Sequence, residues 1–172
     1  GCECLQVFAK TPRQWRAKPI DPGVAQAFRT RCAEADMGPV VVHSAYLINL
    51  GSADDALWER SYTALADELQ RAELLGAASV VTHVGTRFKT DPAKSPDRIA
   101  QGVDRAWAMA GVSATRLLLE NTAAAGTTYG NGPDELGAVL ERLDIAKGHV
   151  GVCLDTCHAH AAGWDLSLGD TW

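Results

Sequence analysis

Short apolar runs rich in β-branched residues alternate with longer segments of helical periodicity along the chain. The apolar runs predict strands at residues 4–9, 39–43, 79–83, 116–120 and 150–155. Because strands alternate with helices, we expect right-handed crossovers and a parallel sheet. Parallel strands are buried on both faces, which agrees with the lack of polar alternation in these runs.

Four segments between the strands predict helices. The first has Asp21 as its N-cap and Pro22 at its first helical position, and we expect it to end at Gly38. Its expected buried residues are Val24, Ala27, Phe28 and Cys32. The second helix is expected at residues 52–76, and its inward face is formed by Trp58, Tyr62, Leu65, Leu69 and Ala72.

The third predicted helix begins near residues 95–96, and the fourth follows Gly132 and Pro133 and ends at residues 147–148. The inward side chains of the third helix are Ile99, Val103 and Ala106 or Trp107. Those of the fourth are Leu136, Val139, Leu140 and Leu143. Each helix therefore offers an apolar face to the sheet.

Two parallel architectures fit this alternation, a doubly wound open sheet and a closed barrel. No glycine-rich phosphate loop follows any predicted strand, which removes the main sequence support for a nucleotide-binding open sheet. We therefore predict an α/β fold of the (β/α)8 barrel type, with residues 1–172 as one partial domain of about five βα units. The chain starts without Met, almost directly at a strand, and residues 170–172 resemble the start of a helix, so we expect an internal piece of a longer protein.

Composition places the chain among globular proteins. Its 172 residues are 47% hydrophobic and 22% charged, which excludes disorder, collagen and coiled coil. No apolar run approaches the roughly 18 residues of a membrane span, and no secretory signal is evident, so we expect a cytosolic protein without membrane contact. The odd number of cysteines, 5, predicts reduced thiols.

Metal-binding residue types fall at the ends of successive predicted strands. His43, His83, Glu120 and Asp155 are separated by 40, 37 and 35 residues, about one βα unit each. The active sites of such barrels lie at the carboxyl ends of the strands, so these side chains are expected to converge there. His158 lies three residues after Asp155 and can reach the same edge of the sheet. Imidazole together with carboxylate suits zinc, manganese or iron better than calcium or magnesium.

A single histidine at a strand end is more often a hydrogen-bonded core or loop residue than a ligand, so no one of these positions predicts a metal site by itself. Their combination does, because three of the 5 histidines fall at strand ends where two carboxylates also fall. We interpret His149 and His160 as ordinary structural residues. We expect Cys153 to pack within its strand, and for Cys157 both packing and metal contact remain open.

Five segments closely resemble the endonuclease IV (deoxyribonuclease IV) family of zinc-dependent abasic-site endonucleases: residues 8–15, 43–51, 83–85, 120–123 and 151–163. The resemblance implies a barrel with three zinc ions that hydrolyses the phosphodiester 5′ to an abasic site and leaves a 3′-hydroxyl. The expected partner is double-stranded DNA containing abasic sites, and we expect a monomer. The five predicted strands would match strands two to six of that barrel.

The same resemblance implies individual roles. His43 and His83 are similar to ligands of the first zinc, Glu120 to the carboxylate that bridges the first and second, Asp155 to a ligand of the second and His158 to a ligand of the third. Glu120 and Asp155 are the expected catalytic residues. The remaining ligands of the family lie on later strands, so about one zinc ion is expected to be well held here.

The resemblance also implies a DNA-binding surface, formed by Arg13, Gln14, Tyr46 and Leu47 on loops that enter the minor groove at the lesion. Thr11 departs from the Asn that the family often carries. Residues 1–18 hold four basic residues, including Lys10, against one acidic residue, a local charge of +3, although the whole chain has a net charge of -5. Such a basic segment is either a phosphate-binding patch or a solvated loop.

Two rival functions stay open. Related barrels use a similar rim with one divalent ion as sugar isomerases or epimerases, and these are expected to carry a catalytic Lys or a second Glu pair and no basic wedge loop. The other rival is an inactive remnant, because five strands of an eight-stranded barrel leave two sheet edges unpaired.

Overall fold

A computed structural model describes residues 1–88, 91–145 and 148–167. Within these ranges the sheet has five parallel strands in sequence order. They are β1 (Leu5–Val7), β2 (Val40–His43), β3 (Ser79–His83), β4 (Arg116–Glu120) and β5 (Val150–Cys153). All five predicted strands are confirmed, and their ends differ from the expected bounds by no more than two residues.

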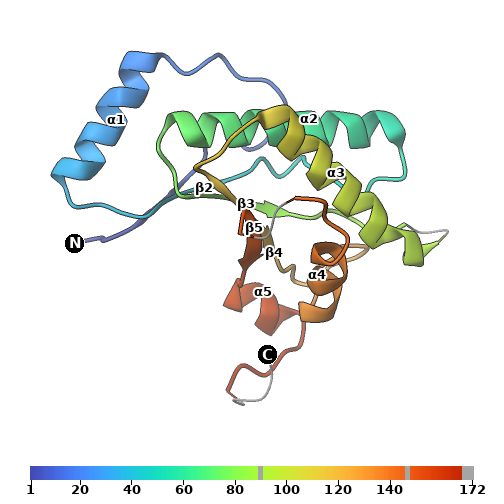
Figure 1. The fold of residues 1–172 in the computed structure, drawn as a ribbon. Coiled ribbons are helices and arrows are strands. Elements are labelled where there is room, and N and C mark those ends of the chain that lie inside the picture. The colour runs from blue at the N-terminus through green and yellow to red at the C-terminus, as the bar shows by residue number, and fades with distance from the viewer. Residues whose placement is uncertain (89–90, 146–147, 168–172) are drawn as a thin grey trace.

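Helices connect the strands and form the second layer. They are α1 (Pro22–Glu34), α2 (Asp55–Leu74), the short 3-10 helix η1 (Pro92–Lys94), α3 (Ser95–Ala110), α4 (Pro133–Leu140) and α5 (Thr156–Ala161). α2 packs on β2, β3 and α3, while α3 contacts α4 and α4 contacts β5 (Figure 1). No helix in the described ranges is both long enough and apolar enough to cross a bilayer.

The hydrophobic core lies between the sheet and the α2–α3 pair. The predicted inward face of α2 is confirmed, because Trp58, Tyr62, Leu65, Leu69 and Ala72 are all buried. The predicted face of α3 is also confirmed, with Ile99, Val103 and Ala106 fully buried and Trp107 partly buried. Full burial of one large aliphatic side chain contributes about 1.5–3 kcal/mol, so this layer holds the strands in place beneath the site.

The first helix begins as expected but ends early and buries a different face. Asp21 Oδ1 accepts the N–H groups of Gly23 (2.8 Å) and Val24 (3.1 Å). Contrary to expectation, Val24 is 63% exposed and Ala27 is exposed, whereas Ala25 is buried. Positions 25, 28 and 32 share one face of a helix at 100° per residue, and position 27 lies nearly opposite. The predicted buried face of α1 was therefore too wide, because it included the exposed residues Val24 and Ala27.

The fourth helix is also shorter than predicted, since α4 ends at Leu140. Leu136 and Val139 are buried as expected, and Leu140 and Leu143 are partly buried. The expected end at residues 147–148 falls partly outside the described residues, as does the expected helix start at 170–172. The short helix α5 was not predicted, and it contains His158.

The register of the sheet aligns the ends of β3, β4 and β5, and the end of β2 lies two residues earlier in the register. His83 pairs with Glu120 across β3 and β4, and Glu120 pairs with Cys153 across β4 and β5. β2 ends at His43, which pairs with Val81 in the same register. The carboxyl ends of β2, β3, β4 and β5 therefore form one edge, which carries the candidate ligands.

Candidate metal centre

Three of the predicted ligands meet at this edge. His43 Nε2 lies 3.2 Å from Glu120 Oε2, and His83 Nε2 lies 2.8 Å from the same oxygen. His43 and Glu120 are buried, whereas about a third of the His83 side chain is exposed. Two imidazole nitrogens from neighbouring strands thus converge on one carboxylate oxygen.

The orientation of the two rings fits a metal ion. His43 Nδ1 donates to the Ser44 carbonyl oxygen (2.8 Å), which leaves Nε2 facing Glu120. The buried His83 Nε2 makes no hydrogen bond within the described part of the chain, because its approach to Glu120 lacks hydrogen-bond alignment. Ligands about 2.0 Å from a tetrahedral zinc ion lie about 3.3 Å apart. The His43 separation of 3.2 Å is close to this value, and the His83 separation of 2.8 Å is shorter. The donors therefore fit a small divalent ion.

His43 and Glu120 influence each other's ionisation, and His83 also acts on Glu120. Burial acts to raise the pKa of Glu120, but the close polar contacts and positive charge of His43 and His83 outweigh it and lower that pKa from 4.5 to about 2. Burial acts to lower the pKa of His43, but Glu120 and the Ser44 carbonyl raise it above 6.5. A proton on His43 therefore competes with a metal ion for the same nitrogen.

A second group of ligands shares Glu120. One candidate ligand atom each of Glu120, Asp155 and His158 lies within 4.8 Å of the others, as is also true of His43, His83 and Glu120. The ring centroids of His83 and His158 are 5.4 Å apart, so the two groups are adjacent. A carboxylate shared by two ligand groups is the arrangement that two closely spaced ions require.

Local structure positions Asp155 and His158. Asp155 caps α5, because its Oδ1 accepts the His158 N–H at 2.8 Å, and its Oδ2 lies 3.7 Å from His158 Nδ1. His158 Nδ1 donates to the Asn121 carbonyl at 2.9 Å, which leaves the other ring nitrogen, Nε2, for a ligand. Asp155, an N-cap residue type directly after an apolar strand, was a sequence signal for this helix start.

Asn121 is a supporting residue that sequence reasoning missed. Its side chain is fully buried, donates through Nδ2 to the Asp155 carbonyl (2.9 Å) and accepts the Asp155 N–H through Oδ1 (2.6 Å). It therefore ties the end of β4 to the end of β5, next to Glu120. The available signal was a polar amide directly after a ligand at the end of an apolar strand.

Aromatic side chains form one wall of the centre. Tyr46, 56% exposed, is stacked on His83 with ring centroids 6.3 Å apart and meets His43 edge-on at 5.4 Å. Phe8, 40% exposed, lies 5.5 Å from His43 and 5.4 Å from Tyr46. Phe8 was not predicted as a site residue, because it fell inside the strand predicted at residues 4–9, which ends at Val7 in the structure.

The structure also brings the predicted DNA-facing loops to this wall. Arg13 and Gln14 are exposed on the loop after β1, and Leu47 is partly exposed beside Tyr46 on the loop after β2. The Tyr46 N–H donates to the Pro12 carbonyl at 3.0 Å, so the two loops are joined. The four predicted residues therefore lie on two connected loops beside the candidate ligands.

The predicted basic segment needs a correction at Lys10. Its side chain has no exposed surface, and Nζ lies 2.8 Å from Asp67 Oδ2 and 3.5 Å from Glu68 Oε1. Lys10 is therefore a buried, paired residue and adds nothing to a phosphate-binding surface. Arg13 remains exposed on the same loop.

Among the described residues, the other histidines and cysteines are not members of either ligand group. The His149 ring packs against Trp107 with centroids 5.1 Å apart, and His160 is exposed. Cys153 and Cys157 both carry free thiols, and among the described residues neither belongs to a candidate ligand group.

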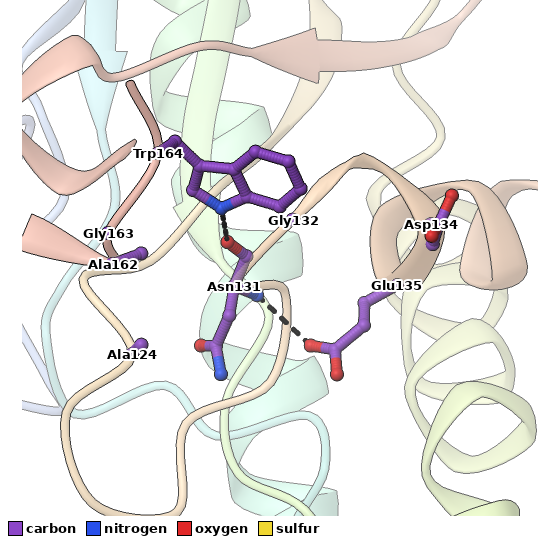
Figure 2. A pocket seen from close by; sticks show the side chains of 8 residues that line it. All are labelled: Ala124, Asn131, Gly132, Asp134, Glu135, Ala162, Gly163 and Trp164. Atoms are coloured by element: carbon purple, nitrogen blue, oxygen red, sulfur yellow. Dashed lines mark hydrogen bonds between the residues drawn. The ribbon is translucent and has the colours of Figure 1, made fainter. Parts of the chain in front are cut away.

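A cavity of about 510 Å³ lies between the loop before α4 and the segment after α5 (Figure 2). Trp164 Nε1 donates to the Asn131 carbonyl at 3.0 Å, and Glu135 Oε2 accepts the Asn131 N–H at 3.0 Å. A Cβ at Gly132 would lie 2.6 Å from the Trp164 ring, so this close approach requires glycine. The described lining contains none of the candidate ligands, and its contacts fix the chain after α5.

A parallel α/β sheet with imidazoles and carboxylates at its carboxyl edge defines the class of α/β-barrel proteins with a candidate metal centre. The chain belongs to the xylose isomerase-like TIM barrel family, whose sequence model matches residues 1–171. This match confirms the predicted fold class.

The resemblance to endonuclease IV is also confirmed. The chain is 43% identical over 170 residues to the probable endonuclease 4 of Methanoculleus marisnigri, covering 99% of this chain and 60% of the relative. It is 43% identical over 171 residues to endonuclease 4 of Thermus thermophilus, covering 97% and 57%. A crystal structure of endonuclease IV from Thermus thermophilus superimposes with a TM-score of 0.80 at 39% identity, covering 92% of this chain and 55% of that one. The chain thus spans about 60% of the length of these curated relatives.

Solved sugar-epimerase structures share the fold at lower identity. A D-tagatose 3-epimerase-like protein superimposes with a TM-score of 0.72 at 16% identity, covering 91% of this chain and 57% of that one. At this identity the likeness describes the fold alone.

Proposed function

We propose that the chain carries the metal centre of a zinc-dependent DNA repair endonuclease that cleaves the phosphodiester 5′ to an abasic site and leaves a 3′-hydroxyl. The observation that carries the proposal is the position of Glu120 Oε2, 3.2 Å from His43 Nε2 and 2.8 Å from His83 Nε2, in a carboxylate that also belongs to a second ligand group. The relatives named endonuclease 4, at 37–43% identity, support this reaction class.

The proposed ligands have distinct tasks. His43 and His83 offer nitrogens to a first zinc ion, and Asp155 and His158 offer donors on the other side of the shared Glu120. A divalent ion held there lowers the pKa of a bound water and neutralises charge on a phosphodiester. Because His43, His83 and Glu120 come from adjacent strands of a packed sheet, we propose that the first ion is the best held.

The two proposed catalytic carboxylates would act on an anionic substrate through the cations that they hold. Glu120 is ionised at neutral pH, and its pKa of about 2 extends this ionisation into acid, so its carboxylate is available to both ligand groups. Asp155 is oriented by Asn121 and by its own cap of α5. We propose that these two residues hold the reacting groups in place and leave charge stabilisation to bound ions.

The proposed DNA-facing surface is the pair of loops beside the aromatic wall. Tyr46 and Leu47 would enter the minor groove as wedges, while Arg13 and Gln14 contact the backbone or the groove edge. Wedge residues that enter beside an abasic nucleotide oppose less stacking than at an intact base pair. Double-stranded DNA containing abasic sites is therefore the proposed partner, and we propose that the chain acts as a monomer.

The test is an assay on a duplex with one abasic-site analogue, using zinc-loaded chain in excess so that one slow turnover is detectable. We expect tighter binding to this duplex than to the matched intact duplex, and cleavage that is very weak or absent, because the resemblance places further ligands on later strands. Any product should carry a 3′-hydroxyl that a polymerase extends, and it should disappear in Glu120→Gln. Equal binding of both duplexes would contradict the proposal.

The two rival functions give different outcomes in the same experiments. A sugar epimerase would exchange hydrogen on a ketose with solvent and would not prefer abasic DNA. An inactive remnant would bind neither zinc nor abasic DNA. The epimerase structures support only the fold, whereas the endonuclease relatives match at 37–43% identity, so the endonuclease is the better supported function.

A further inference from the structure

The two loops proposed to face DNA are both attached to one turn of α2. This turn contains Asp67, Glu68 and Arg71, which lie below the loop after β1 and the loop after β2. None of these three residues is a candidate metal ligand. Metal binding therefore does not explain the contacts that these three residues make with the two loops.

Lys10 attaches the first loop to this turn. Its fully buried ammonium lies 2.8 Å from Asp67 Oδ2 and 3.5 Å from Glu68 Oε1. Lys10 stands three residues before Arg13, so this anchor is close in sequence to the proposed DNA contact.

Glu68 attaches the second loop through the same oxygen. Glu68 Oε1 accepts the Ala45 N–H at 3.0 Å, and Ala45 directly precedes Tyr46. The Glu68 side chain is 1% exposed. Burial raises the pKa of Glu68, and the Lys10 charge and the Ala45 N–H only partly offset this rise. One carboxylate oxygen thus contacts both loops in a place where a charge is costly.

The far end of the first loop is attached to the same helix. Arg71 donates through Nη2 to the carbonyls of Lys18 (3.0 Å) and Ala17 (3.3 Å), and its Nε lies 2.9 Å from both oxygens of Asp67. The Arg60 guanidinium lies 4.4 Å from the centre of the Trp15 ring. The loop is therefore held on α2 at both ends and in the middle.

We propose that Lys10 and Glu68 form a positioning pair that fixes the Arg13–Gln14 loop relative to the Tyr46–Leu47 loop for recognition of the lesion. The inference rests on the proposed function for its purpose. A buried ion pair is seldom more stabilising than an apolar pair of similar size, so stability alone does not explain it. Placing two recognition loops in one geometry before binding avoids an ordering cost when DNA binds.

The test compares the wild-type chain with the neutral double variant Lys10→Met/Glu68→Gln. This variant leaves no unpaired buried charge at either position, and the amide oxygen introduced by Glu68→Gln can still accept the Ala45 N–H. The matched control is Asp97→Asn/Arg142→Met, which removes an ion pair of 2.7 Å between α3 and the segment after α4, away from both loops. Melting curves measured on all three chains establish that each one folds.

Residue-resolved amide hydrogen exchange gives the decisive readout. The Gln14 N–H bonds to Thr11 within the first loop, and the Tyr46 N–H bonds across to Pro12. We expect these two amides to exchange about tenfold faster in the neutral variant, while the Ala45 amide stays protected. Unchanged Gln14 and Tyr46 exchange, or an equal rise throughout the core, would overturn the inference.

DNA binding supplies the second readout. The preference of the zinc-loaded chain for abasic over intact duplex should fall about tenfold in the neutral variant, comparable to one lost stacking contact, at unchanged zinc content. The control variant should keep the preference. If the wild-type preference survives in the neutral variant, the positioning role is wrong. If the wild-type chain has no preference, the proposed function fails, and the exchange data alone decide whether the pair fixes the loops.

Discussion

His83 Nε2 lies 2.8 Å from Glu120 Oε2, yet it makes no hydrogen bond within the described ranges of the chain. His43 Nε2 approaches the same oxygen to 3.2 Å from the neighbouring strand β2. A carboxylate oxygen approached by two imidazoles at these distances is arranged as the ligands of one ion are. The predictions about metal binding all depend on this arrangement.

Replacing Glu120 by Gln should weaken zinc binding at least about tenfold, because the change removes the charged member of the ligand set. A zinc titration of the purified chain measures this. Glu73→Gln is the matched control, since the Glu73 carboxylate accepts the N–H groups of Ser113 and Ala114 away from the centre. Equal zinc affinity in Glu120→Gln and wild type would contradict the ligand assignment.

The stability of the zinc-free chain should depend on pH through His43 and Glu120. The pKa of His43 is raised above 6.5, so its stabilising contribution is complete below 6.5 and is lost as the pH rises through the folded pKa. The pKa of Glu120 is lowered from 4.5 to about 2, so its contribution is complete above 4.5 and is lost as the pH falls through about 2. Melting temperatures should therefore show the largest contribution of the pair between pH 4.5 and 6.5.

The stabilisation that zinc provides should instead increase with pH. Zinc requires neutral imidazoles, so the increase in melting temperature on adding zinc should be small near pH 5 and large near pH 8. The His43 pKa above 6.5 should delay this gain to a higher pH than an unperturbed histidine would. A zinc effect that is equal at both pH values would contradict ligation by His43 and His83.

Tyr46→Ala and Leu47→Ala should separate recognition from packing. Tyr46 is 56% exposed, so its removal should hardly change the melting temperature or zinc content. Binding to abasic DNA should weaken by about 1–3 kcal/mol for a lost stacking contact. Val24→Ala, another exposed apolar side chain, should change neither property. A Tyr46 variant that loses stability but keeps its lesion preference would show that Tyr46 only packs.

Arg13→Ala should flatten the salt dependence of DNA binding. If Arg13 contacts a phosphate, the slope of log Kd against log salt concentration should fall by about one. The control is Arg31→Ala, because Arg31 is exposed on α1 and pairs with Glu34 at 3.1 Å. The same slope in the Arg13 variant and the wild type would place Arg13 away from the phosphates.

The strands and the convergence of the candidate ligands could be predicted from sequence. Carboxyl ends of neighbouring parallel strands meet at one edge, so the positions of His43, His83 and Glu120 at the ends of apolar runs were sufficient to bring them together. The inward face of α2 was equally clear, because large apolar side chains recur on it with helical spacing.

Other features depend on contacts that local patterns do not contain. The partners of Lys10 lie more than 50 residues away on α2, so a basic residue in a polar loop gave no sign of its burial. The face of α1 was misplaced because small residues such as Ala25 and Ala27 differ little in local pattern, and only tertiary packing selects between them. Helix α5 was missed because Asp155 was interpreted only as a ligand and not also as an N-cap.

Elemental analysis of zinc in the purified, folded chain tests the central claim most directly. After equilibration with zinc and removal of the excess, we expect about one zinc ion per wild-type chain, because His43, His83 and Glu120 form the best-held group. The His83→Ala variant should retain much less zinc at an unchanged fold, and Glu73→Gln should retain as much as wild type. A folded wild-type chain that retains no zinc, or a His83→Ala chain that retains the full amount, would contradict the account.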